Sequence, residues 1–166
     1  MNTLQYPHIV KSLPYPIVSY EPIIDKLTLS IHHNKIYVNY VKKLNLLIKE
    51  NKELEKYSIE ELIYNPYLIP PTILNTVLYC AGGIYNHELF FNNLSPTKNT
   101  QISGPFKKKI LEKYHSVEAY KNVIHEIASS PINYNWIITA IDNKNNIQME
   151  SNKIRQAFLD FFQSKA

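Results

Sequence analysis

The sequence is poor in cysteine and arginine, and it lacks any long apolar run. Cys80 is the one cysteine among 166 residues, so a disulfide within the chain and a cysteine-based zinc site are both excluded. No run of about 18 apolar residues is present, which argues against a transmembrane helix. The first residues lack the charged start and apolar block of a secretory signal. These absences favour a protein of a reducing compartment with no membrane span.

The composition is that of a folded chain with a mild positive charge. Hydrophobic residues make up 45% of the sequence, which is enough for one sizeable core or two small ones. Its 18 basic residues include one arginine, Arg155, and with 14 acidic residues they give a formal net charge of +4. This charge favours partners with negative surfaces, but many enzymes are as basic. Composition alone therefore selects neither a nucleic-acid-binding protein nor an enzyme.

The first half of the chain predicts two long helices. Residues 1–22 contain four prolines and are expected to form an extended arm. Within residues 25–49 apolar side chains recur at steps of three and four, which predicts a long amphipathic helix. A second long helix is expected over residues 72–94. It contains Gly82 and Gly83, which weaken a helix and therefore indicate a close approach of its backbone to another part of the protein.

Shorter elements are expected between and after these helices. Ser58, with Glu61 three residues later, is the capping-box pattern that opens a short helix. The other expected elements are helices over 107–114, 117–129 and 152–164, and a strand, turn and strand within 135–149.

Two histidines are the candidate metal-binding residues. His32 lies in the stretch IHHNKIYVNY of the first long helix, and His87 lies on the second. An antiparallel pair of these helices would bring both imidazoles to one buried point. Sites for iron, manganese or zinc commonly use three or four protein ligands, so two histidines do not complete one. The alternatives are half of a metal site or two packed core histidines. His33 is expected on the polar face of its helix or beside the site.

Four segments, taken in order, resemble a known family. They are LPYPIVSYEPIIDKLTLSIHHNKIYVNYVKKLN, AGGIYNHELFFNNLSP, YHSVEAYKNVIHEIA and NWIITAIDNKNN. The first two are similar to the opening and second helix of the iron/manganese superoxide dismutases, and the others to the start of that family's C-terminal domain. This resemblance implies a mostly helical α+β fold. Its parts would be an arm and α-hairpin domain, residues 1–97, and a shortened α/β domain, residues 98–166.

The resemblance also implies roles for three residues. His32 and His87 match the two helix-borne metal ligands of the family, and Tyr40 matches the tyrosine that gates its substrate channel. A packed aromatic is the alternative for Tyr40. The chain departs from the family pattern at Ile36, where the family has a histidine, and at Phe91, where it has an aromatic residue that is usually tryptophan. The polar surroundings of the metal are therefore expected to be lost.

A further departure concerns the last two ligands of the family, which come from an Asp-x-Trp-Glu-His motif. No histidine follows His125 in this sequence. Aligning residues 159–165 with the motif keeps Asp160 as the aspartate and leaves Gln163 and Ser164 in place of the glutamate and histidine. The same residues also fit an amphipathic helix. We therefore expect a pseudoenzyme with no catalytic residue and no cofactor, the alternative being retained iron or manganese.

This pattern resembles the superoxide-dismutase-like proteins of the mitochondrial ribosomal small subunit, which use the fold for docking. The resemblance implies a mitochondrial location and, as partners, ribosomal RNA and ribosomal proteins, among them a second superoxide-dismutase-like subunit. Two alternatives stay open. One is an active dismutase whose missing ligands come from a second chain, and the other is a structural subunit of another mitochondrial assembly, such as a respiratory complex.

A dense run of lysines is the candidate RNA contact. Lysine neutralises backbone phosphates without reading the base sequence. An ordinary solvated helix face is the alternative interpretation of the run. Its members are Lys107, Lys108, Lys109 and Lys113.

Overall fold

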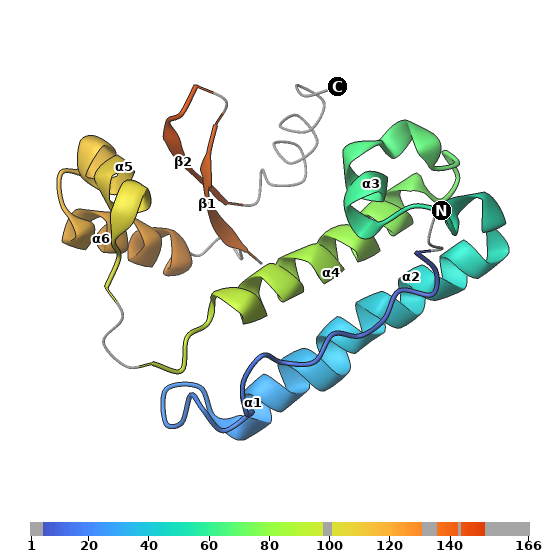
Figure 1. The fold of residues 1–166 in the computed structure, drawn as a ribbon, viewed down its shortest axis with the longest axis horizontal. Coiled ribbons are helices and arrows are strands. Elements are labelled where there is room, and N and C mark those ends of the chain that lie inside the picture. Colours follow the sequence, from blue (N-terminus) through green and yellow to red (C-terminus); the bar gives the residue numbers. More distant parts are fainter. Residues whose placement is uncertain (1–4, 98–100, 131–135, 143, 152–166) are drawn as a thin grey trace. The chain divides into compact units, whose positions relative to one another are not determined.

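The structure is a computed structural model that describes residues 5–97, 101–130, 136–142 and 144–151 (Figure 1). They belong to two units, residues 1–98 and 99–166, and each unit is described by itself. The first is helical, and the second combines helices with a two-stranded sheet, which confirms the predicted mostly helical α+β class. No helix among the described residues is long and apolar enough to cross a membrane.

The helix predicted over residues 25–49 is present, but a π-helical segment interrupts it. It starts at α1 (Lys26–Ile31), where the Asp25 side chain accepts a hydrogen bond from the Thr28 N–H. The segment η1 (His32–Tyr37) then forms a π-helix, and α2 (Val38–Glu50) completes this first long helix. π-Helical turns are rare in proteins overall, but those that occur often lie at functional sites. Here the π-helical turn contains the two adjacent histidines.

The rest of the first unit contains further helical segments. It comprises η2 (Lys52–Leu54), α3 (Ile59–Tyr64), η3 (Pro66–Leu68) and the long α4 (Leu74–Asn93). Helices α2 and α4 lie side by side and run in opposite directions, and α3 also packs on α4 (Figure 1). The capping box predicted at Ser58 is confirmed, because both of its hydrogen bonds to Glu61 are present. The buried core includes Leu44, Ile48, Leu54, Leu62, Val77, Cys80 and Ile84.

The proline-rich arm forms neither helix nor strand over its described residues, 5–22. The arm runs along the α-hairpin of the first unit because the arm's backbone is hydrogen-bonded to that hairpin. The His8 N–H donates to Asn45 Oδ1, and Asn45 Nδ2 donates back to the His8 carbonyl, at 3.0 and 2.9 Å. The N–H groups of Gln5 and Tyr6 both donate to the Glu55 carbonyl. The arm is therefore attached to the hairpin at several separate points.

The second unit contains α5 (Gly104–Tyr114), α6 (Val117–Ala128), β1 (Ile137–Ile141) and β2 (Ile147–Ser151). Helix α5 begins three residues before its predicted start, because Pro105 is compatible with a first helical turn. The strands form the predicted antiparallel hairpin, with Ile141 opposite Ile147. A small core of Ile110, Tyr120 and Ile147 joins the helices to the hairpin. The helix predicted over 152–164, with Asp160, lies outside the described residues.

Candidate functional site

The structure brings His32 and His87 together. His32 projects from the π-helical segment and is half-buried, and His87 projects from α4 and is 3% exposed. Their ring centres are 4.8 Å apart, and the ring planes are nearly perpendicular, at 80°. Two imidazoles that share one metal ion through bonds of about 2.1 Å have ring centres roughly 4.5–5.5 Å apart. The spacing therefore fits a shared ion as well as an edge-to-face packing contact.

Burial favours the neutral form of both imidazoles. Burial lowers the pKa of His87, against an opposing effect of its hydrogen bond to Gly83. Burial also lowers the pKa of His32, with smaller contributions from His87 and His33. His87 Nδ1 lies 2.6 Å from the Gly83 carbonyl. A carbonyl only accepts, so Nδ1 carries the proton and Nε2 carries the lone pair, which is the tautomer that a metal ligand needs.

Aromatic rings surround the histidine pair. The ring centres of Phe90 and Phe91 lie 5.3 and 5.4 Å from that of His32. The ring of Tyr40 lies 5.3 Å from that of His87. Ile36, at the position where the resemblance implied a departure from histidine, is 43% exposed and offers no polar side-chain atom to the pair. The immediate neighbours of the pair are thus mostly apolar ring surfaces.

Tyr40 occupies its place because Gly83 has no side chain. A Cβ atom at Gly83 would lie 2.5 Å from ring atoms of Tyr40, so the close approach predicted from the two glycines is confirmed at this one. Gly82 has open space where its Cβ would be. The Tyr40 hydroxyl donates to that of Tyr79 at 3.1 Å, and burial, together with Tyr79, raises the pKa of Tyr40 to about 12. A phenol with that pKa is protonated at neutral pH.

Of the two positions expected for His33, on the polar face of its helix or beside the site, the polar face is wrong. Its side chain is 8% exposed, and its two ring nitrogens lie 2.8 Å from the Lys11 carbonyl and 2.7 Å from Asn34 Oδ1. The arm covers this side of the helix, and its carbonyl provides a partner that a lone helix does not have. The signal was present in the spacing, because the core positions at Val41 and Tyr37 continue back to His33 at steps of four.

A second polar group that the sequence analysis missed lies next to His33. Tyr37 is fully buried, and its hydroxyl donates to Glu88 Oε1 at 2.9 Å while accepting from the Lys11 N–H at 3.1 Å. The Lys11 ammonium forms an ion pair with the same Glu88 carboxylate. Burial raises the pKa of Tyr37 well above its ordinary value. This network joins the arm, the π-helical segment and α4.

A histidine pair between two antiparallel helices, beside a seated tyrosine, is the arrangement that the motifs predicted. The sequence model of the α-hairpin domain of the iron/manganese superoxide dismutases matches residues 7–95, which is more than half of the chain. The chain belongs to this family. The matched range contains both histidines, Tyr40 and Gly83.

The family implies an iron or manganese ion, and the described residues fit only part of its ligand set. Two neutral imidazoles are suitable donors, and His87 has the right tautomer. Within the described ranges, no group of three or more histidine, cysteine, aspartate or glutamate side chains is placed to hold a metal. Asp160, the doubtful third ligand, lies outside those ranges. We therefore derive no redox step from these residues.

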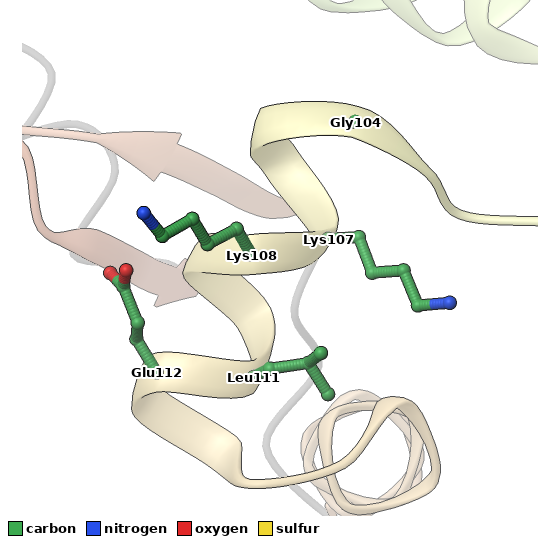
Figure 2. Close-up of a pocket in the computed structure, with 5 residues that line it drawn as sticks. All are labelled: Gly104, Lys107, Lys108, Leu111 and Glu112. Atoms are coloured by element: carbon green, nitrogen blue, oxygen red, sulfur yellow. The ribbon is translucent and has the colours of Figure 1, made fainter.

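The structure divides the lysine run of α5. Lys107 and Lys108 are exposed, and they line a surface pocket of about 500 Å³ with Gly104, Leu111 and Glu112 (Figure 2). Lys109 forms an ion pair with Glu112 at 3.0 Å. The Lys113 ammonium donates to the Ile147 carbonyl at 2.7 Å and to Gln148. Two of the four lysines are thus used within their own unit.

The lowered pKa values of His32 and His87 predict a loss of stability in mild acid. In the unfolded chain these groups take up protons near pH 6.5, whereas the folded state resists protonation until a lower pH. The free energy of unfolding should therefore fall as the pH drops from about 7.5 to 5.5. Urea unfolding at several pH values measures this effect.

The matched control for this pH dependence replaces both histidines with glutamine. The variant should show a shallower fall over the same range. Some dependence should remain, because burial also lowers the pKa of His8. A wild-type stability that stays constant or rises towards pH 5.5 would contradict the prediction.

Proposed function

We propose that this chain is a non-catalytic structural component of the mitochondrial ribosomal small subunit, built on the superoxide dismutase fold. The chemistry of the histidine pair carries the non-catalytic part of the proposal. His32 and His87 offer two nitrogen donors, and no third ligand is placed beside them among the described residues, whereas sites for iron or manganese commonly use three or four. On this proposal the family fold is retained for its surfaces.

The choice of the ribosome is supported by the sequence resemblance and by charge. The second unit, residues 99–166, has nine basic and six acidic residues, so it holds +3 of the formal net charge of +4. Ribosomal proteins meet a dense array of phosphates, for which a basic unit is suited. The proposed partners are ribosomal RNA and ribosomal proteins, including a second superoxide-dismutase-like subunit.

Gradient sedimentation of a gentle mitochondrial extract tests this proposal. With magnesium kept high enough to preserve ribosomes, the chain should migrate with the small ribosomal subunit and move to lighter fractions after nuclease treatment. Mass spectrometry follows the chain across the gradient. Migration in a large particle that resists nuclease would overturn the ribosomal assignment in favour of another mitochondrial complex.

Metal analysis tests the non-catalytic part. Chain purified from mitochondria should contain far less than one iron or manganese ion per histidine pair and should not dismutate superoxide. A small dimer with close to one ion per site would overturn the proposal, because it would mean that a second chain completes the ligand set.

The lysines of α5 give a further prediction. Replacing Lys107 and Lys108 with alanine should weaken RNA binding and lower the slope of log affinity against log salt by about 1.4 for single-stranded RNA. Replacing Lys109 and Lys113 is the matched control, since both already have partners within the unit. Equal effects of the two double substitutions would contradict the assignment. If replacing Lys107, Lys108 and Lys109 together with alanine left RNA binding unchanged across the salt series, the proposed phosphate contact would be ruled out.

A further inference from the structure

The long helix of the first unit carries a second concentration of positive charge. Residues 26–50 contain five lysines and one acidic residue, Glu50. The formal charge of this helix is therefore +4, which equals that of the whole chain. The other acidic residues of the unit lie outside the helix.

Three of these lysines recur at steps of seven residues and are exposed, and we call them the lysine stripe: Lys35, Lys42 and Lys49. Lys42 and Lys49 lie on α2, where seven residues are close to two helical turns and about 10.5 Å along the axis, and Lys35 lies seven positions earlier in the π-helical segment η1. All three are exposed. The opposite face buries Val41 and Leu44 against the rest of the hairpin. The stripe therefore lies on a rigid support and points to solvent.

The lysine stripe forms no ion pair among the described residues. The ion pairs of the described residues are Lys11 with Glu88 and Lys109 with Glu112, and neither involves the stripe. No acidic residue lies three or four positions from Lys35 or Lys42 in the sequence, whereas Lys49 has Glu53 four positions later. The neighbouring Lys43 lies over the ring of Tyr79, 5.8 Å from its centre, and is therefore not counted with the stripe.

We infer that the lysine stripe binds the phosphate backbone of RNA. Regularly spaced cations on one rigid helix contact several groups of a polyanion at once, whereas a small anion meets a single lysine. Lysine is a point charge without the fork of arginine, so it suits phosphates and does not read bases. Binding should therefore be independent of base sequence and steep in salt. The choice of RNA among polyanions rests on the proposed function.

The test measures RNA binding by the full-length purified chain. The probe is a fluorescent uridine oligomer of about 20 nucleotides, titrated between about 50 and 200 mM salt. In the test variant Lys35, Lys42 and Lys49 become glutamine. In the matched control Lys26, Lys52 and Lys56 become glutamine, which removes the same charge from other exposed positions of the same unit. Circular dichroism and a thermal melt establish that both variants are folded.

The stripe variant should lose about 2 from the salt slope, because each lysine contributes roughly 0.7, and the control should lose much less. Equal losses would overturn the inference in favour of net charge alone. No binding by the wild-type chain at the lowest salt would overturn it outright. If the stripe variant lost binding to polyglutamate but bound RNA as the wild-type chain does, the inferred partner of the stripe would be an acidic protein instead of RNA. Sedimentation with ribosomes is a separate readout, so failure of the proposed function leaves these results interpretable.

Discussion

Replacing Gly83 with alanine is expected to lower the free energy of unfolding by about 1–3 kcal/mol. The added methyl group would lie 2.5 Å from ring atoms of Tyr40, so the ring must leave its place beside His87. The colliding atoms belong to the rigid ring close to its attachment, and a small rotation of the side-chain end does not relieve the contact. Urea unfolding followed by circular dichroism measures the change.

The neighbouring glycine provides the matched control. Gly82 has nothing within 4 Å of the Cβ position, so its replacement with alanine should raise stability by about 0.5–1 kcal/mol through helix propensity. Replacing Tyr40 with alanine in the Gly83→Ala background should recover part of the loss relative to the sum of the single changes. Equal effects at Gly82 and Gly83, or strict additivity with Tyr40, would contradict this account.

Replacing Tyr37 with phenylalanine is expected to cost about 1–3 kcal/mol and to loosen the arm. The lost hydroxyl donates to the Glu88 carboxylate and accepts from the Lys11 N–H, and both groups would lose a partner. Hydrogen bonds to charged groups are stronger than neutral ones. Urea unfolding gives the cost, and faster hydrogen exchange at the Lys11 amide reports the loosening.

The same substitution at Tyr40 is the matched control for Tyr37. The Tyr40 hydroxyl bonds only to that of Tyr79 among the hydrogen bonds described, and Tyr79 is 59% exposed. Water can replace this bond, so Tyr40→Phe should cost less than about 0.5 kcal/mol. A Tyr37→Phe variant as stable as Tyr40→Phe, with unchanged exchange at Lys11, would show that the network does not hold the arm.

Much of the secondary structure could be predicted because its signals are local. Ser58 and Glu61 cap a helix through bonds that span three residues. The strands Ile137–Ile141 and Ile147–Ser151 were predictable because they are adjacent and joined by a polar turn. The π-helical turn at His32–Tyr37 was not predictable, because the apolar pattern of residues 25–49 fits a continuous α-helix and does not show where hydrogen bonds become i→i+5.

The candidate site was predictable in part. The motifs placed His32 and His87 on two helices, and the structure brings their rings together. The spacing of His33 from Tyr37 and Val41 indicated a buried position, but its partner, the Lys11 carbonyl, could not be predicted because it lies 22 positions away in the arm. The partners of particular lysines were also hidden from the sequence. Lys113 bonds to Ile147, which is 34 positions further along the chain.

The sequence by itself determined the family, the helices and their caps, the strand hairpin and the two histidines on facing helices. These depend on residue types and on bonds between residues a few positions apart. Only the tertiary structure decided that Gly83 leaves room for Tyr40, that Tyr37 links Glu88 to the arm, and that the lysine stripe forms no ion pair within the described ranges. Such relations join residues that are tens of positions apart, and they exist only once the faces of separate helices have packed together.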